Sequence, residues 1–423
     1  MDKFIINGPC KAKGQINVAG SKNSALPILA ATLLFDTPVE LSNVPNVRDI
    51  RTMFDLLRSL NKKIIVSKNK KKVKIYNSKK KISTFCSYSI VKQMRASILA
   101  LPGLISKHRT AVISSPGGCA IGTRPINYHL SGLKKLGMKY VLKKGYIHAT
   151  AKQGLKPNDI TFKKISVGAT ESLLIASTLC RGTVFLRGVA CEPEVKDLCK
   201  FLISAGAKIK WIGKRTIKVE GVKKLNSTSY SIMGDRIEAI SWAALTVLTG
   251  GKIKIGGFKN IKLLKTELDL LKKIGASIKY KEGKIEIKGK SKLKSVNLET
   301  KEYPGFSTDA GPLFGILLCK ANGRSIFTEN IFENRLNGWV AEVRRLGAKI
   351  QLKGNKAIIE GNTKFQGAEE LMSSDLRASV ALCLAAISSS GRSVVSRIYM
   401  LERGMENFEK KARRIGVNIK RIS

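Results

Sequence analysis

Cys119 lies in a glycine-rich segment that also carries an arginine five positions further on. Residues 114–129 read Ser-Ser-Pro-Gly-Gly-Cys-Ala-Ile-Gly-Thr-Arg-Pro-Ile-Asn-Tyr-His. The glycines permit backbone angles closed to other residues, so we expect a loop that can move. Arg124 favours the thiolate of a nearby cysteine and brings the thiol into the range of proton exchange at neutral pH. The spacing therefore indicates a loop that carries an acid, although a lone cysteine in such a loop is more often inert than catalytic.

The other cysteines carry no such neighbours. The chain has eight, at positions 10, 86, 119, 180, 191, 199, 319 and 383. They form no Cys-x-x-Cys pair and no close Cys/His cluster, so the sequence predicts neither a disulfide framework nor a metal site. Most, such as Cys319 in Ile-Leu-Leu-Cys, lie in apolar runs and are interpreted as small core residues. We expect a reducing, cytoplasmic environment.

Cationic and polar residues recur where predicted helices begin. These starts are Lys22-Asn23-Ser24, Met94-Arg95-Ala96-Ser97, Gly168-Ala169-Thr170, Arg236-Ile237-Glu238, Thr308-Asp309 and Leu376-Arg377-Ala378-Ser379. A cation at a helix N-terminus opposes the macrodipole, whereas a bound anion satisfies both the cation and the N–H groups there. For any one helix, pairing of the arginine with an acid such as Asp375 explains the pattern equally well. Repetition at matching positions favours anion binding.

A helix end of the form Leu-x-x-Leu-Gly-Ala-x-Ile organises the whole chain, because it occurs six times. The residues at its glycine position are Asn61, Gly137, Gly206, Gly275, Gly347 and Gly416. Glycine ends a helix in the left-handed conformation, which asparagine also tolerates. The spacing predicts six units of about 70 residues, each with two helices and β-rich segments. Short alternations such as Val73-Lys74-Ile75-Tyr76 predict hairpins, so we expect an α+β fold with mixed sheets outside, helices inside and two sets of three units.

The net charge of +47 would by itself suggest nucleic acid or an anionic membrane as partner. Runs such as Lys70-Lys71-Lys72 and Lys79-Lys80-Lys81 have few aromatic residues between them to stack bases, so they are interpreted as solvated faces. Small anionic substrates fit the charge equally well. No apolar stretch approaches the roughly 18 residues of a membrane span, and the first residues show no leader pattern. We expect a soluble protein without membrane insertion.

Taken together, the motifs resemble those of the UDP-N-acetylglucosamine enolpyruvyl transferases, enzymes of the first committed step of peptidoglycan synthesis. The match runs nearly end to end and rests on Gly20-Ser21-Lys22-Asn23-Ser24-Ala25-Leu26-Pro27, Met94-Arg95-Ala96-Ser97, Pro116-Gly117-Gly118-Cys119, Gly122-Thr123-Arg124-Pro125, Ser166-Val167-Gly168-Ala169-Thr170, Thr308-Asp309, Phe332-Glu333-Asn334-Arg335, Asp375-Leu376-Arg377-Ala378-Ser379 and Arg403-Gly404. The resemblance implies two similar, three-fold repeated domains that face one another across a cleft. Residues 21–233 would form the first domain, and residues 1–20 with 234–423 the second.

The resemblance also implies an addition–elimination reaction that needs no metal or cofactor. Cys119 would protonate C3 of phosphoenolpyruvate and can add covalently to it, Asp309 would be the base near the sugar hydroxyl, and Lys22 and Arg403 would share in catalysis. The phosphoenolpyruvate-binding residues would be Lys22, Asn23, Arg124, Arg335, Arg377 and Arg403. The UDP-N-acetylglucosamine-binding residues would be Asn23, Arg95, Arg124, Pro125, Ile126, Asn127, Tyr128, Lys164, Ile165, Ser166, Val167, Asp309 and Ile331.

Several positions depart from the family pattern. Asn127, Tyr128 and Leu99 replace a common aspartate, leucine and tryptophan, and we expect altered substrate affinity. Ser307 replaces a proline, and Ala310-Gly311-Pro312-Leu313 replaces a polar stretch after Asp309, which is expected to perturb the setting of the base. No departure removes a residue assigned to chemistry, so activity is expected.

Other interpretations stay open. Asp309 at a helix start is ordinarily a cap, and Arg335 beside Glu333 resembles a surface ion pair. The shikimate-pathway enolpyruvyl transferase shares the fold and the phosphoenolpyruvate half-site but lacks the cysteine loop. A basic nucleic-acid-binding protein is the more distant alternative, and the sequence indicates no oligomeric state.

Overall fold

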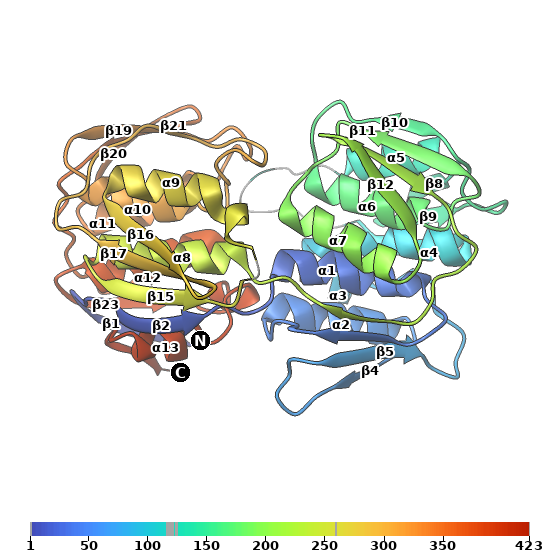
Figure 1. Ribbon diagram of the computed structural model, residues 1–423, viewed down its shortest axis with the longest axis horizontal. Helices are drawn as coiled ribbons and strands as arrows, with labels where there is room; N and C mark the ends of the chain where they lie inside the picture. Colours follow the sequence, from blue (N-terminus) through green and yellow to red (C-terminus); the bar gives the residue numbers. More distant parts are fainter. Residues whose placement is uncertain (1, 116–121, 123–125, 259, 423) are drawn as a thin grey trace. The chain divides into compact units, whose positions relative to one another are not determined.

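The computed structural model describes residues 2–115, 122, 126–258 and 260–422. The chain divides into two compact units, each with its own hydrophobic core (Figure 1). The N-terminal unit contains residues 20–115 and 126–233, and the C-terminal unit contains residues 2–19, 122, 234–258 and 260–422. Among the described residues, no helix combines the length and the apolar character needed to cross a membrane.

The described strands form six four-stranded sheets that share one topology. In each sheet an edge strand pairs parallel with its neighbour, and the two remaining pairings are antiparallel. The predicted mixed sheets are therefore confirmed. The sheets of the N-terminal unit are β14-β3-β5-β4, β6-β7-β9-β8 and β10-β11-β13-β12, and those of the C-terminal unit are β2-β15-β17-β16, β18-β19-β21-β20 and β22-β23-β1-β24.

Most strands have four to six residues. The strands of the N-terminal unit are β3 (Val39–Ser42), β4 (Lys62–Val66), β5 (Val73–Asn77), β6 (Phe85–Cys86), β7 (Thr110–Ser114), β8 (Lys139–Lys143), β9 (Tyr146–Thr150), β10 (Asp159–Thr161), β11 (Thr183–Arg187), β12 (Lys208–Gly213), β13 (Thr216–Glu220) and β14 (Thr228–Ser231). Those of the C-terminal unit are β1 (Lys3–Gly8), β2 (Lys13–Asn17), β15 (Lys252–Gly256), β16 (Ala276–Lys281), β17 (Lys284–Gly289), β18 (Leu298–Glu299), β19 (Arg324–Thr328), β20 (Lys349–Lys353), β21 (Lys356–Glu360), β22 (Leu371–Met372), β23 (Gly391–Ser396) and β24 (Ile419–Ile422).

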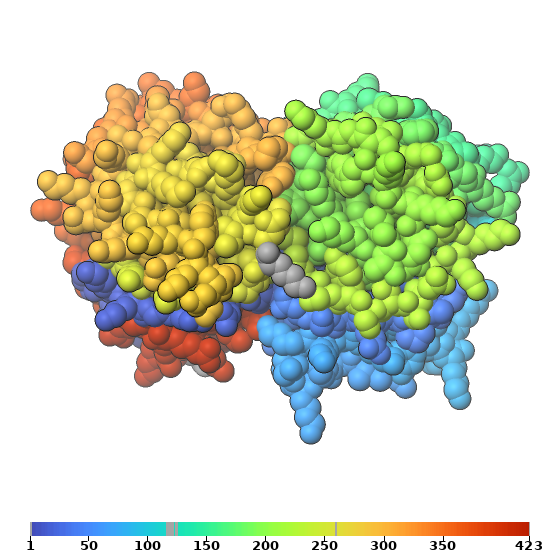
Figure 2. All heavy atoms as spheres, in the orientation of Figure 1, coloured from blue at the N-terminus to red at the C-terminus, as the bar shows by residue number. Residues whose placement is uncertain are grey.

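The sheets have one buried face and one solvated face. In β5, Val73 and Ile75 are buried while Lys74 between them is exposed, as expected of a strand with period-two alternation. The β4–β5 hairpin projects from the surface of its unit and carries the exposed Lys70 and Lys72 at its turn (Figure 2). This lysine run therefore forms a solvated face, as the sequence predicts.

An inner helix from each repeat lies almost fully buried. In the C-terminal unit α8, α10 and α12 pack against one another, and each contacts a different sheet (Figure 1). All residues of α8 are buried, including the charged Arg236 and Glu238. The inner helices are α1 (Lys22–Ala31), α4 (Ala100–His108), α6 (Val167–Ser177), α8 (Arg236–Leu248), α10 (Gly311–Lys320) and α12 (Leu376–Ser388).

A second helix in each repeat ends at the predicted left-handed residue. Asn61 has φ 67°, and the five glycines at the matching positions have φ between 85° and 136°. The predicted helix ends are thus confirmed, including the use of asparagine in the first copy. These helices are α2 (Arg48–Ser59), α5 (Asn127–Lys135), α7 (Pro193–Ser204), α9 (Lys265–Ile274), α11 (Asn337–Arg345) and α13 (Phe408–Arg414). Shorter helices are η1 (Thr32–Leu34), α3 (Tyr88–Val91), η2 (Arg95–Leu99), η3 (Ile261–Leu264) and η4 (Leu401–Arg403).

The first two strands of the chain complete sheets of the C-terminal unit. β1 lies between β23 and β24, with Lys3 opposite Ile422, and β2 pairs parallel with β15. The backbone N–H of Ala19 then donates to the carboxylate of Glu238 at 2.8 Å. The start of the chain is therefore bound firmly into this unit.

Most described cysteines are core residues, as predicted. Six are buried, and Cys10 is half-buried. Burial raises the pKa of Cys319 to about 12 and that of Cys180 to about 11, because a low-dielectric surrounding disfavours the thiolate. These thiols remain protonated and unreactive at neutral pH.

Candidate active site

Asp309 forms the centre of a charged cluster in the C-terminal unit. It lies two residues before α10, and the residue at the N-cap position is Ala310. The Asp309 carboxylate accepts hydrogen bonds from the guanidinium groups of Arg335 and Arg377, the latter at 2.8 Å. The interpretation of Asp309 as an ordinary helix cap is therefore wrong.

Both arginines are buried. Arg335 is 3% exposed and Arg377 is 4% exposed, and the Nε–H of Arg335 also donates to the carbonyl of Thr308 at 3.4 Å. A buried guanidinium must be matched by negative charge and hydrogen bonds. Arg335 is thus part of the Asp309 cluster, and its interpretation as a surface partner of Glu333 is wrong.

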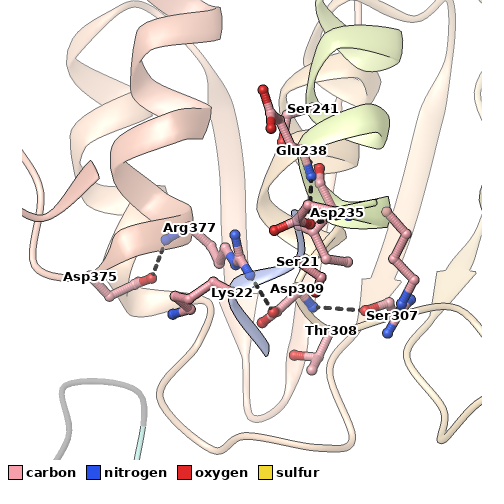
Figure 3. A network of polar contacts seen from close by, with 12 residues as sticks. Ser21, Lys22, Asp235, Glu238, Ser241, Ser307, Thr308, Asp309, Asp375 and Arg377 are labelled. Atoms are coloured by element: carbon pink, nitrogen blue, oxygen red, sulfur yellow. Dashed lines mark hydrogen bonds and ion pairs between the residues drawn. The ribbon is translucent and has the colours of Figure 1, made fainter. Parts of the chain in front are cut away.

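Asp375 fixes the start of α12 and thereby the position of Arg377. Its carboxylate accepts from the backbone N–H groups of Arg377 at 2.7 Å and Ala378 at 3.3 Å, as an N-cap residue does. Figure 3 shows the Arg377 side chain directed toward Asp309. The cap therefore sets the helix start, and the guanidinium is left to bind Asp309.

The charge on Arg377 is stabilised by its surroundings. Burial by itself lowers the pKa of a guanidinium, but the negative charges of Asp309, Asp235 and Asp375 together raise the pKa of Arg377 above its ordinary value. Asp375 also lies 4.0 Å from the guanidinium of Arg335. The cluster thus holds two permanent cations beside the carboxylates of Asp309 and Asp375.

Arg403 lies in a short helix packed on the start of α12. η4 contacts α12, and a Cβ at the following Gly404 would lie 2.7 Å from a methyl carbon of Leu376. A larger residue at this position would therefore require the Leu376 side chain to shift. Ile331 lies in the segment between β19 and Arg335. The structure thus brings Asp309, Arg335 and Arg377 into direct contact, with Arg403 on a neighbouring element of the same unit.

In the N-terminal unit, Lys22 is the first residue of α1. The hydroxyl of Ser21 caps the helix by accepting from the N–H of Ser24 at 3.4 Å. The ammonium group of Lys22 lies 3.2 Å from the carboxylate of Asp49, and both side chains are largely buried. Sequence reasoning missed Asp49, whose only signal is an acidic residue in the first turn of α2.

Two helices that begin in predicted binding segments are joined by one hydrogen bond. Asn127 and Tyr128 begin α5, directly after Ile126, and Val167 begins α6 after its cap Ser166, which accepts from Ala169 N–H at 3.3 Å. His129 of α5 lies 2.7 Å, Nδ1 to Oγ, from Ser172 of α6. The starts of both helices are therefore held at a fixed separation, with Lys164 and Ile165 just before α6.

Two helix starts differ from the prediction. Arg95 begins the 3-10 helix η2, and the α-helix α4 starts only at Ala100. Thr308 and Asp309 precede α10, which starts at Gly311. Pro312 is the second residue of α10, a position at which its missing N–H costs no intrahelical hydrogen bond.

Ser307, one of the departures from the family pattern, forms a hydrogen bond with the backbone of Asp309. Its hydroxyl accepts from the backbone N–H of Asp309 at 3.3 Å, and its own N–H donates to Glu267 at 3.3 Å. A proline would make neither bond, since it has no N–H and no hydroxyl.

Some predicted residues lie outside the described part of the chain, namely Cys119, Arg124 and Pro125. Within the described part, no group of three or more His, Cys, Asp or Glu side chains is placed to hold a metal ion.

Comparison with known proteins identifies the family. The family model for EPSP synthase (3-phosphoshikimate 1-carboxyvinyltransferase) matches residues 6–412. A UDP-N-acetylglucosamine 1-carboxyvinyltransferase of Pelagibacter ubique is 51% identical over 423 residues, covering 100% of both chains. Proteins of the same name from Trichlorobacter lovleyi and Acinetobacter baylyi are 42% and 41% identical, again over 100% of both chains.

Solved structures share the fold at lower identity. The enolpyruvyl transferase NikO from Streptomyces tendae superposes with a TM-score of 0.91 at 22% identity, covering 99% of this chain and 98% of that one. EPSP synthase from Acinetobacter baumannii gives a TM-score of 0.78 at 19% identity, with 100% of both chains covered. With its six repeated sheets and its full-length relatives, this chain belongs to the EPSP synthase family and is an enzyme of the carboxyvinyltransferase class.

Proposed function

We propose that this enzyme transfers the enolpyruvyl group of phosphoenolpyruvate to the 3-hydroxyl of UDP-N-acetylglucosamine and releases phosphate. The support is the full-length identity of 41–51% to relatives that carry the corresponding name. The shikimate alternative is favoured less, because the EPSP synthase structure shares only the fold at 19% identity. The nucleic-acid alternative has no support beyond the charge.

The reaction proceeds by addition and then elimination. The oxygen of the sugar 3-hydroxyl attacks C2 of phosphoenolpyruvate, and its proton passes to a base. C3 gains a proton from an acid, which gives a tetrahedral intermediate. C3 then loses a proton, and the bond between C2 and the phosphate oxygen breaks. These two changes release phosphate and restore the double bond between C2 and C3. The enzyme must therefore supply a base, an acid and positive charge.

The observation that carries the proposal is the contact of Asp309 with Arg335 and Arg377. Asp309 is the proposed base, and both its oxygens are oriented by a guanidinium. Each guanidinium has five N–H donors, so the carboxylate of phosphoenolpyruvate can bind the same pair. Such preorganised cations stabilise the anionic tetrahedral intermediate.

The remaining roles in the reaction are those of the acid and of the phosphate ligands. Cys119 is the proposed acid at C3, able also to form a covalent adduct, and Lys22, Arg124 and Arg403 are the proposed phosphate ligands. The pairing of Lys22 with Asp49 at 3.2 Å orients its ammonium group. Lys22 and Arg403 thus contribute to catalysis through charge.

The nucleotide sugar would bind mainly through the N-terminal unit. The proposed contacts come from Asn23 in α1, Arg95 in η2, residues 124–128 before and in α5, and residues 164–167 at the start of α6, together with Asp309 and Ile331. The His129–Ser172 contact joins α5 and α6, the helices in which two of these segments end. In the cell, the product would enter peptidoglycan synthesis in the cytoplasm and so serve cell-wall growth, cell shape and division.

The test is phosphate release from phosphoenolpyruvate with either acceptor. We expect turnover with UDP-N-acetylglucosamine and none with shikimate 3-phosphate. Turnover with shikimate 3-phosphate alone would refute the assignment, and salt-sensitive RNA binding without phosphate release would favour the nucleic-acid alternative.

A further inference from the structure

Glu329 joins three segments of the C-terminal unit through one buried carboxylate. It follows β19 and is 3% exposed. Its Oε1 accepts from the hydroxyl of Thr300 at 2.9 Å and from the N–H groups of Ile331 at 2.8 Å and Phe332 at 3.2 Å. Its Oε2 accepts from the hydroxyl of Thr308 at 2.8 Å. Four donors on one carboxylate offset the cost of burying its charge.

Two of these segments carry the charged cluster. Thr308 directly precedes Asp309. Phe332 begins the turn that leads to Arg335, whose backbone N–H donates to the Phe332 carbonyl at 3.2 Å. Glu329 therefore braces both partners of the Asp309–Arg335 contact. It holds the Asp309 segment through the hydroxyl of Thr308, and the Arg335 segment through the backbone N–H groups of Ile331 and Phe332.

Thr308 is the link between Glu329 and the cluster. Its hydroxyl donates to Glu329, while its carbonyl accepts from the Nε–H of Arg335. The residue is therefore held on one side by the buried carboxylate and on the other by an arginine of the cluster. A change of the Thr308 backbone would move the adjoining Asp309.

We propose that Glu329 is a positioning residue of the transfer reaction, acting through Thr308 to fix Asp309 and Arg335 relative to one another. The proposal rests on the proposed function, since it assumes that Asp309 is the base. Glu329 itself needs no contact with substrate. A displacement of about 1 Å of a catalytic group costs on the order of 100-fold in rate, so loss of this brace is expected to lower kcat.

A matched pair of variants separates positioning from folding. Thr308→Val and Thr300→Val each replace a hydroxyl by a methyl group of similar size, and each removes one hydrogen bond to Glu329. Thr300 additionally accepts from the N–H of Asn330 at 2.8 Å, so its variant is expected to lose at least as much stability. Thr308 alone of the two adjoins Asp309.

We expect Thr308→Val to lower kcat by about 10- to 100-fold with the KM for phosphoenolpyruvate within about two-fold. Thr300→Val is expected to keep kcat within about three-fold of wild type. Its denaturant midpoint is expected to fall at least as far as that of Thr308→Val. Equal losses of kcat in both variants, or wild-type kcat in Thr308→Val, would overturn the proposal and leave Glu329 a stabilising residue only.

A second measurement does not depend on turnover. Hydrogen exchange of the Arg335 Nε–H, followed by NMR and assigned with Arg335→Lys, is expected to accelerate several-fold in Thr308→Val and to stay unchanged in Thr300→Val. Unchanged exchange in Thr308→Val refutes the brace. Wild-type enzyme that releases no phosphate with UDP-N-acetylglucosamine contradicts the proposed function alone, since the exchange result then still decides whether Glu329 braces the cluster.

Discussion

The guanidinium of Arg377 donates to the carboxylate of Asp309 at 2.8 Å, although the two residues lie 68 positions apart in the sequence. Arg335 also donates to this carboxylate, so Asp309 and the two guanidinium groups form one connected cluster of charges. The contact has consequences for activity that can be measured residue by residue.

Asp309→Asn removes the proposed base. We expect kcat to fall by about 10² to 10⁴, the usual contribution of a general base. Binding of phosphoenolpyruvate, measured by calorimetry, should be as tight or tighter, because the amide removes a negative charge beside both arginines. Asp159→Asn, at an exposed ion pair with Arg187, is the control with unchanged kcat. A kcat of Asp309→Asn within three-fold of wild type would exclude the base role.

Arg377→Lys keeps the charge but loses the planar fork of donors. We expect kcat/KM for phosphoenolpyruvate to fall by about 100-fold, or about 2.7 kcal/mol. Arg345→Lys changes an exposed arginine paired with Glu342 at 3.1 Å and should leave the steady-state kinetics unchanged. Equal activity of both variants would show that charge at position 377 suffices.

Cys119→Ser is expected to lose activity, and Cys119→Asp to retain some, because the role at C3 requires an acid. A serine hydroxyl is too weak a proton donor at neutral pH. The assay is phosphate release over a range of pH. Wild-type activity of the serine variant would remove Cys119 from the acid role.

Lys62 gives the free energy of unfolding a distinct pH dependence. Its ammonium group donates to the Phe35 carbonyl at 3.0 Å. Burial lowers the pKa of Lys62 from 10.5 to about 8. Nearby Asp36 opposes this shift, and Lys107 adds to it. Between these values the unfolded chain binds the proton that the folded chain has lost, so stability rises with pH from about 8 to 10.5.

The size of this rise is at most about 3 kcal/mol. Chemical denaturation at pH 7.5 and 10 measures it, with Lys62→Met as the reference that lacks the titrating group. If wild type and Lys62→Met gain equally between the two pH values, the lysine does not titrate in this range.

Gly347 tests the repeated helix end. Its φ of 97° and the φ of 67° at Asn61 lie in the region that β-branched residues avoid. We expect Gly347→Val to be less stable than Gly347→Asn by about 1–2 kcal/mol, measured from denaturant midpoints. Equal stability would mean that the backbone relaxes at this helix end.

The repeats were predictable because their signals are local. A glycine or asparagine at a helix end acts on its own backbone, so Asn61 and the five matching glycines could be recognised without knowledge of tertiary contacts. The alternation in β5 likewise reports burial of adjacent residues. These features sufficed to predict the six units and their mixed sheets.

The contacts within the candidate site were not predictable in this way. Asp49 lies 27 residues from Lys22, and Glu329 is an unremarkable acid after a strand until Thr308 and Ile331 are brought to it. At Asp309, the local signal favoured a cap, and tertiary contacts with two arginines prevailed. Similarly, the hydrogen bond from the backbone N–H of Asp309 to the Ser307 hydroxyl was not predicted.

Because β1 lies between β23 and β24, the two units are completed at different times during synthesis. The N-terminal unit is complete in the nascent chain once Met233 has left the ribosome, whereas β1 acquires its partner β24 only with the last described residues. Because domains generally fold as units during translation, the N-terminal unit can fold while β1 still lacks its neighbours. A ribosome stalled after Met233 has emerged but before β23 would therefore hold one complete unit and a β1 strand without its sheet partners.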